Sequence, residues 1–194
     1  MTEWEKFFDQ KIKEIAKEKT VLDVGGGRPF QKYLKNYKEY FKDCDYKTLD
    51  QASQYQPDIL GDILDIPIAD ESVDAVICWS VLEHVKEPQK AAQEIYRILK
   101  KGGKALIAVP FLYPYHAQKG IYKDYYRFTE DGINYLFGNF SKIEICKVKG
   151  LFGVFLGLLP LKSVRKSLIF FADFLDKIFK AKNLTAGYNI FLVK

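Results

Sequence analysis

The sequence predicts an α/β fold in which a doubly wound, mostly parallel sheet carries helices on both faces. Two observations predict it. Short β-branched or apolar runs alternate with segments of helical periodicity, and the first of these runs ends in three consecutive glycines, Gly25 to Gly27. Alternating strands and helices fold as parallel βαβ units, and such sheets bind ligands beyond their strand ends. At 194 residues, 48% of them hydrophobic, the chain suits a single domain over 1–194.

Each expected strand is a short run rich in Val, Ile, Leu or Ala with turn residues or charges on either side. These runs are residues 20–24, 46–49, 59–60, 72–79, 104–110, 142–149 and 188–193. The run at 104–110 is apolar almost throughout, as a central parallel strand is. Seven such strands that alternate with helices predict a Rossmann-like sheet.

The expected helices show apolar residues at helical spacing, and they are residues 4–19, about 30–40, 88–101 and 129–137. The third has clear ends. Pro88 suits the first turn, Lys100 and Lys101 suit the negative end of the helix dipole, and Gly102 suits the position just past the last turn.

Composition narrows the classes of function. The net charge of +5 permits an anionic partner, but no block of consecutive basic residues favours nucleic acid. Cys44, Cys78 and Cys146 are far apart, so we expect neither disulfides nor a metal site. The first 20 residues lack the apolar core of a signal peptide, and no run reaches transmembrane length. These observations predict a cytoplasmic protein.

The glycine turn and the acidic residues near it predict the ligand. A dinucleotide fingerprint needs a third glycine where Phe30 stands, so a nicotinamide or flavin site fits poorly. Asp23 lies at the end of the first strand, separated from the glycines only by Val24, and suits a ligand's ammonium group. Asp50 ends the second strand and suits two ribose hydroxyls, and Asp62 follows the third and suits an exocyclic amine. Any one alone is more simply a turn or capping residue, but together they favour S-adenosylmethionine, with S-adenosylhomocysteine as product.

Four segments between Val21 and Pro110 resemble the type 11 subgroup of the class I S-adenosylmethionine-dependent methyltransferases. They are VLDVGGG at 21–27, GDILDIP at 61–67, SVDAVICWSVLEHV at 72–85 and ILKKGGKALI at 98–107. The resemblance implies an antiparallel last strand and methyl transfer. It implies that Cys78 to Ser80 lie under the sulfonium. Gly26 departs mildly from the pattern, since many relatives carry cysteine or another small residue there. The residues expected to hold the cofactor are Asp23, Gly25, Gly26, Gly27, Asp50, Gln51, Asp62, Ile63, Trp79, Ser80 and His84.

The segment after the fifth strand is expected to face the acceptor. It contains His116 and then Asp124-Tyr125-Tyr126-Arg127-Phe128-Thr129. This arrangement resembles a branch associated with saccharide, lipopolysaccharide or envelope biosynthesis, which implies a small-molecule or saccharide-like acceptor. We take His116 as the candidate general base, with Asp124, Tyr125 and Arg127 as candidates for acceptor contact. Packing within a lid explains the tyrosines equally well.

Residues 150–186 form an insertion before the last strand. Its apolar run at 151–161 precedes Lys162, Arg165 and Lys166, and a second apolar segment follows at 168–179. A helical cap over the acceptor pocket is the favoured interpretation. A dimer contact and a peripheral membrane contact through 151–180 are the alternatives. A lipid-linked acceptor would unite the cap with the membrane contact. The sequence predicts no particular oligomeric state.

Two other functions remain open at this stage. One is RNA methylation, which the basic charge permits, although neither an appended RNA-binding domain nor an Asn-Pro-Pro-Tyr-type motif is present. The other is a non-catalytic partner protein that keeps the fold and binds S-adenosylmethionine. The intact glycine turn and Asp50 argue against a loss of cofactor binding.

Overall fold

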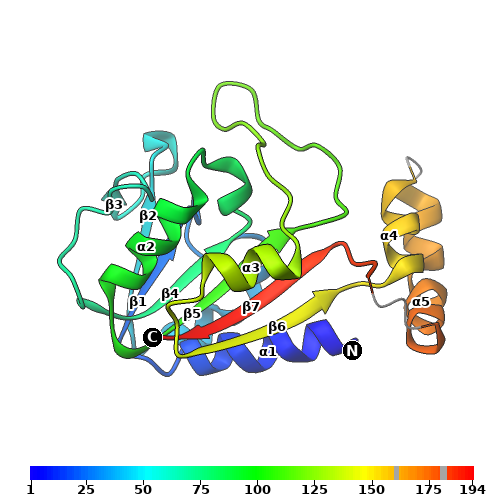
Figure 1. Cartoon of the computed structure of the whole chain (residues 1–194), viewed down its shortest axis with the longest axis horizontal. Helices are drawn as coiled ribbons and strands as arrows, with labels where there is room; N and C mark the ends of the chain where they lie inside the picture. Colours follow the sequence, from blue (N-terminus) through cyan, green and yellow to red (C-terminus); the bar gives the residue numbers. More distant parts are fainter. Residues whose placement is uncertain (160–161, 180–182) are drawn as a thin grey trace.

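One sheet organises the computed structural model, which describes residues 1–159, 162–179 and 183–194 (Figure 1). Its strand order is β3-β2-β1-β4-β5-β7-β6. The strands are β1 (Thr20–Val24), β2 (Asp45–Asp50), β3 (Ile59–Leu60), β4 (Val73–Trp79), β5 (Leu99–Pro110), β6 (Lys142–Val148) and β7 (Gly187–Val193). The first five run parallel, whereas β7 pairs antiparallel with both β5 and β6. The predicted Rossmann-like sheet with an antiparallel last strand is confirmed.

Helices and helical turns connect the strands. They are α1 (Glu3–Ile15), η1 (Lys32–Phe41), η2 (Ser53–Tyr55), η3 (Leu82–His84), α2 (Pro88–Ile98), α3 (Glu130–Leu136), α4 (Leu151–Leu158) and α5 (Lys162–Ile178). A capping box between Thr2 and Glu5 starts α1, since each side chain satisfies a backbone N–H of the first turn. The hydroxyl of Thr129 accepts from the N–H of Gly132 and caps α3.

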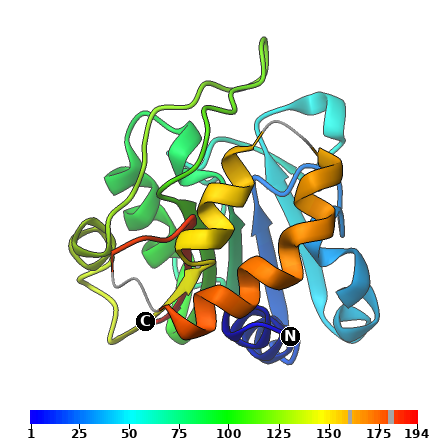
Figure 2. The same cartoon turned by 90° about the vertical axis from the view of Figure 1, so that its right-hand side faces the viewer.

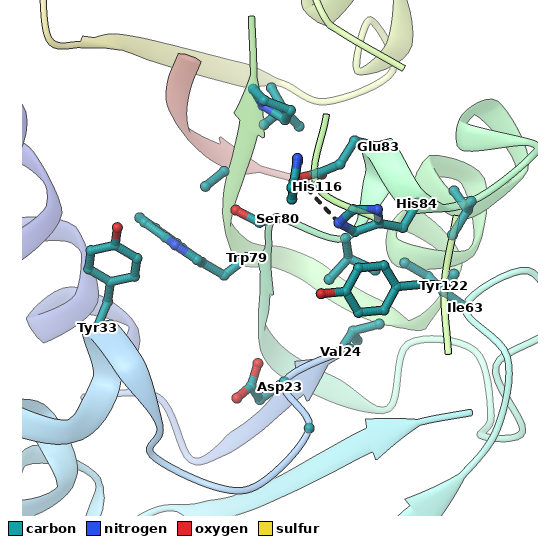
Figure 3. A pocket seen from close by; sticks show the side chains of 18 of the residues that line it. Asp23, Val24, Tyr33, Ile63, Trp79, Ser80, Glu83, His84, His116 and Tyr122 are labelled. Atoms are coloured by element: carbon teal, nitrogen blue, oxygen red, sulfur yellow. Dashed lines mark ion pairs between the residues drawn. The ribbon is translucent and has the colours of Figure 1, made fainter. Parts of the chain in front are cut away.

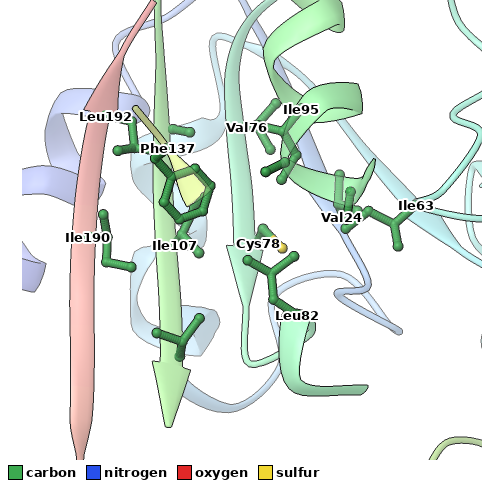
Figure 4. Packing of buried hydrophobic residues seen from close by; sticks show 14 of the residues in the cluster. Val24, Ile63, Val76, Cys78, Leu82, Ile95, Ile107, Phe137, Ile190 and Leu192 are labelled. Atoms are coloured by element: carbon green, nitrogen blue, oxygen red, sulfur yellow. The ribbon is translucent and has the colours of Figure 1, made fainter. Parts of the chain in front are cut away.

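Side-chain alternation along the central strands builds a core on each face of the sheet. Leu22 and Val76 belong with Ile95 of α2 to one cluster, and Figure 4 shows Val76 beside Ile95. Their strand neighbours Val21 and Ala75 belong to the other cluster, which includes residues of α1. Because successive side chains of a strand point to opposite faces, a strand covered on both faces is apolar at nearly every position. The prediction of helices on both faces is therefore confirmed.

The end of α2 differs from its prediction. The helix stops at Ile98, and Leu99 already has extended backbone and begins β5. The N–H of Ser72 bonds to the carbonyl of Ile98, and the N–H of Gly102 bonds to the carbonyl of Lys194. Sheet pairing with distant segments thus replaces the last helical turn. Lys100, Lys101 and Gly102, which were expected to end the helix, belong to β5.

The segment expected as a helix over about 30–40 also differs. It is a 3-10 helix over Lys32–Phe41. Phe30 has φ +53, a left-handed conformation that a right-handed helix does not contain. The helix therefore begins only after Gln31. The first helix, expected over 4–19, ends at Ile15.

The insertion between β6 and β7 contains α4 and α5, which pack against each other. Asp176 of α5 joins them, because its carboxylate accepts hydrogen bonds from the N–H groups of Gly150, Phe152 and Gly153 at 2.8–3.0 Å. These donors surround the N-terminus of α4, where a negative charge is favourable. Figures 1 and 2 show both helices beyond the end of β6. Within the described ranges, no helix is long and apolar enough to cross a membrane.

Candidate active site

A cavity of about 650 Å³ lies at the carboxyl edge of the sheet (Figure 3). Along this edge β1 lies between β2 and β4. This is the point at which the strand order changes direction. Open α/β sheets bind their ligands at this switch point. All residues predicted to hold the cofactor line the cavity, namely Asp23, Gly25, Gly26, Gly27, Asp50, Gln51, Asp62, Ile63, Trp79, Ser80 and His84.

The glycine turn needs each of its three residues. Gly25 and Gly27 have φ of +68 and +61, conformations that cost a residue with a side chain free energy. Gly26 is required for a different reason. A Cβ atom at this position would lie 2.3 Å from Oδ2 of Asp23, far inside van der Waals contact. The turn thus brings bare backbone against a carboxylate that itself faces the cavity.

Asp23 is a buried carboxylate with one free oxygen. Its Oδ2 accepts a hydrogen bond of 2.5 Å from the hydroxyl of Tyr46, whereas its buried Oδ1 has no hydrogen-bond partner among the described residues. Burial raises the pKa of Asp23 to about 6, and the Tyr46 hydrogen bond opposes that rise. A buried unpaired carboxylate oxygen is unfavourable without a ligand, so this atom fits an ammonium group in the cavity.

Asp50 and Asp62 combine local bonds with access to the cavity. Asp50 accepts from the N–H of Gly27 at 3.0 Å and from that of Ala52 at 2.8 Å, which ties β2 to the glycine turn. Each carboxylate oxygen offers more than one lone pair, so Asp50 keeps capacity for hydroxyl donors. Asp62 accepts from the N–H of Leu64 at 2.9 Å. The turn role considered for Asp62 therefore coexists with its place on the cavity wall.

The end of β4 forms the floor between these residues and the acceptor side. Ser80 has φ +57, and strained residues of this kind gather at functional sites. The resemblance extended the floor to Cys78, but that thiol is fully buried in the core cluster and is not among the residues that line the cavity. Trp79 and Ser80 alone of the three reach the cavity wall.

His116 reaches the cavity from the loop after β5, as the sequence predicts. Its Nε2 lies 3.5 Å from Oε1 of Glu83, and its Nδ1 lies 3.2 Å from Oδ2 of Asp124. The backbone N–H of His116 also donates to Asp124 at 2.8 Å. The Glu83 and Asp124 carboxylates raise the pKa of His116, with Glu83 the larger cause.

Asp124 and Arg127 hold the loop in place. Arg127 donates two hydrogen bonds to the Asp124 carboxylate at 2.6 and 2.7 Å and others to the carbonyls of Tyr113 and Pro114 at 3.0 Å. This guanidinium keeps the pKa of Asp124 well below its ordinary range. Asp124, Tyr125 and Arg127 are absent from the residues that line the cavity. Of the four acceptor-side candidates, only His116 therefore reaches the cavity.

Two buried polar residues of the cavity wall escaped the sequence analysis. Glu83 is 1% exposed and Asn189 is 2% exposed, and both line the cavity. A signal existed for each. Glu83 directly precedes His84, and Asn189 is a polar residue within the otherwise apolar run of β7. Neither signal reveals burial, because the residues that bury Glu83 come from a distant loop.

The strand order and the cavity at the switch point define a Rossmann-like ligand-binding fold. Comparison with known proteins shows which proteins the chain resembles. The family model described as "Methyltransferase domain" matches residues 22–107. A methyltransferase structure from Archaeoglobus fulgidus, described as S-adenosylmethionine-dependent, superposes with a TM-score of 0.65 over 97% of this chain and 92% of that one. At 15% identity this likeness concerns the fold.

Curated relatives match over about half of the chain. An uncharacterised protein of Methanocaldococcus jannaschii is 36% identical over 97 residues, 50% of this chain and 43% of that protein. The 2-methyl-6-phytyl-1,4-hydroquinone methyltransferase of Arabidopsis thaliana is 33% identical over 104 residues, 48% of this chain and 30% of that protein. The chain thus spans less than half the length of these relatives. Over residues 22–107 the chain is thus similar to the methyltransferase domain family, and its fold is like that of an S-adenosylmethionine-dependent methyltransferase.

Proposed function

We propose that the chain transfers a methyl group from S-adenosylmethionine to a hydroxyl group of a small-molecule acceptor. The observation that carries the proposal is Oδ1 of Asp23, a buried carboxylate oxygen without a partner among the described residues. It lies at the glycine turn, on the wall of the cavity. A cationic amino-acid group is the ligand that satisfies such an oxygen best.

Four groups of this chain would hold the cofactor. Asp23 binds the ammonium group, and the Gly25–Gly27 turn brings backbone against the methionine part. Asp50 accepts from the ribose hydroxyls, and Asp62 with Ile63 binds the adenine. Bound S-adenosylmethionine supplies a methyl group activated by a sulfonium. The chain's main contribution is then to hold the acceptor in line with that methyl group.

The proposed acceptor site is the part of the cavity around His116. In the proposal His116 accepts the hydroxyl proton as general base. Asp124 fixes the orientation of the His116 ring through its contacts with the backbone N–H and Nδ1 of His116. Arg127 keeps Asp124 ionised and fixed, so both act as positioning residues.

The exposed apolar surface of α4 and α5 favours an acceptor that is linked to a lipid. Large apolar side chains are exposed on α4 and α5, among them Phe155, Phe170, Phe171 and Phe174. The Arabidopsis relative is named for a substrate with a phytyl chain. A saccharide-like head group is the type that the resemblance of residues 116–129 suggests. The Lys162, Arg165 and Lys166 side chains, expected to support membrane contact, lie outside the described ones.

Calorimetric titration with S-adenosylmethionine tests the first part of the proposal. We expect one equivalent to bind to the wild-type chain and at least tenfold weaker binding to Asp23→Asn. Absence of binding to the wild type would overturn the proposed function. Binding without turnover on any lipid-linked or free hydroxyl acceptor would favour the non-catalytic partner, and salt-dependent RNA binding would favour RNA methylation.

A further inference from the structure

Three potential metal ligands converge on the acceptor side of the cavity (Figure 3). Glu83 and His84 come from η3, and His116 comes from the loop after β5. One ligand atom of each lies within 4.8 Å of the others. Nε2 of His116 and Nε2 of His84 lie 3.5 and 3.9 Å from the same atom, Oε1 of Glu83. Both histidines of the chain thus face one carboxylate.

The buried carboxylate of Glu83 lacks hydrogen-bond donors among the described residues and is therefore suited to bind a cation. The side chain is 1% exposed, and neither carboxylate oxygen has a hydrogen-bond partner among the described residues. Burying an unpaired carboxylate is costly, and such groups are normally paired or bound to metal. Two imidazoles at 3.5 and 3.9 Å surround Glu83 without donating a hydrogen bond to it.

Both rings are oriented as metal ligands are. Nδ1 of His84 lies 2.7 Å from the carbonyl of Lys123, and Nδ1 of His116 lies 3.1 Å from the carbonyl of Pro114. Since a carbonyl only accepts, each Nδ1 carries the proton in the neutral ring. In that tautomer each Nε2 has a free lone pair, and it lies 3.5 Å (His116) or 3.9 Å (His84) from Oε1 of Glu83. Metal-binding histidines use the same device, a backbone carbonyl or carboxylate that fixes the other ring nitrogen.

We propose that Glu83, His84 and His116 bind a divalent transition-metal ion of the zinc or cobalt type. Tetrahedral sites with bonds of about 2.0–2.1 Å separate their ligand atoms by about 3.3 Å. Oε1 of Glu83 lies 3.5 and 3.9 Å from the two Nε2 atoms, and all three ligand atoms lie within 4.8 Å of one another, so the two imidazoles would move inward when the ion binds. Two imidazoles and one carboxylate suit such ions better than magnesium or calcium. The proposal departs from the expectation based on Cys spacing, because its ligands are residues other than cysteine.

The proposed site leaves room for one more ligand on its cavity side. Sites with three protein ligands and an open position are typical of catalytic metals. Resting on the proposed function, we assign that position to the acceptor hydroxyl oxygen, whose pKa the ion would lower. With the ion bound, Nε2 of His116 would be a metal ligand in place of the general base, and the proton of the ion-bound hydroxyl would pass to solvent.

Titration of the tag-free, EDTA-treated chain with Co²⁺ tests the site, with calorimetry and visible absorption as readouts. We expect one equivalent to bind and to raise the thermal midpoint. Glu83→Gln and His84→Asn should weaken binding at least tenfold, whereas Glu87→Gln, an exposed neighbour, should bind as the wild type does. Thermal midpoints without metal show that each variant is folded.

The outcomes separate the metal site from the proposed function. Failure of the wild type to bind one equivalent of Co²⁺, or wild-type affinity in both Glu83→Gln and His84→Asn, overturns the metal site. If S-adenosylmethionine still binds in that case, the proposed function stands. If Co²⁺ binds as expected but S-adenosylmethionine does not, the metal site stands and the proposed function fails.

Discussion

The Tyr46 hydroxyl donates to Oδ2 of Asp23 at 2.5 Å and leaves Oδ1 of the same carboxylate for a ligand. Tyr46 is itself held in place, because its ring stacks on Phe30 with centroids 4.3 Å apart. Phe30 stands where a dinucleotide site has its third glycine. The residue that argues against a nicotinamide ligand thus supports the tyrosine that holds the Asp23 carboxylate, for which we propose a cationic partner.

The first prediction concerns the pH dependence of S-adenosylmethionine binding. Asp23 must be ionised to hold an ammonium group, and its pKa in the ligand-free protein is about 6. Affinity should therefore fall as the pH drops through about 6. Tyr46→Phe removes a hydrogen bond that lowers this pKa, so the midpoint should move to higher pH. Calorimetric titration between pH 5 and 8 measures both, and a pH-independent affinity in the wild type contradicts the assignment.

The same carboxylate affects the stability of the ligand-free protein. Its folded-state pKa of about 6 exceeds the ordinary 3.8, so its contribution to stability is present below pH 3.8 and is lost as the pH rises through 6. We expect the free energy of unfolding to decrease more steeply across this interval in the wild type than in Asp23→Asn. Denaturant titrations at matched pH give the comparison, and equal slopes would refute it.

A third prediction concerns Gly26. Alanine there would place its Cβ 2.3 Å from the Asp23 carboxylate, so either the turn or the carboxylate must move. We expect a stability loss of about 1–3 kcal/mol, as in other overpacked sites, and at least tenfold weaker S-adenosylmethionine binding. Gly157→Ala is the matched control, since its Cβ would meet no atom of the described residues within 4 Å apart from its own helix backbone. Thermal unfolding and calorimetry check both variants.

The fourth prediction separates His116 from cofactor binding. His116→Asn should lower kcat by about 10²- to 10⁴-fold, the range for loss of a general acid–base group. The affinity for S-adenosylmethionine should stay within a few-fold, because Asp23, Asp50 and the glycine turn are untouched. Full turnover by this variant on the true acceptor would exclude both the base and the metal-ligand role.

The sequence predicts the sheet well because its signals are local. The β-branched run of β1, the glycines after it and the apolar run of β5 each indicate an element without help from distant residues. The predicted end of α2 was wrong because the true end depends on a distant residue. Lysines and a glycine favour a helix end after Lys101, but the carbonyl of Ile98 bonds to Ser72, and a partner 26 residues away in sequence leaves no local signal.

The residues of the site also divide into those with local sequence signals and those that depend on distant contacts. Asp23 lies at the end of a predicted strand, and Asp50 and Asp62 come just after two others, so the topology alone brings them to one edge. Glu83 acquires its burial and its two imidazole neighbours only when the loop after β5 folds onto η3. The N–H of Tyr125 bonds there to the carbonyl of Glu83 at 2.7 Å. Such a contact joins positions 42 residues apart in the sequence, which periodicity and spacing do not encode.

The last prediction tests the apolar surface of α5. Phe170 is 82% exposed and Phe174 is 56% exposed, one helical turn apart. If this surface contacts lipid, the wild type should co-sediment with anionic vesicles at low salt. The double variant Phe170→Ser, Phe174→Ser should lose most of that binding, because burial of a Phe side chain in an apolar phase contributes about 1.5–3 kcal/mol.

Tyr135→Ser is the control for vesicle binding. Tyr135 is an aromatic residue of α3 that is 83% exposed, and its replacement should leave binding unchanged. Equal co-sedimentation of all three proteins would assign vesicle binding to another surface, and its absence in the wild type would leave the cap or a dimer contact as the role of α4 and α5.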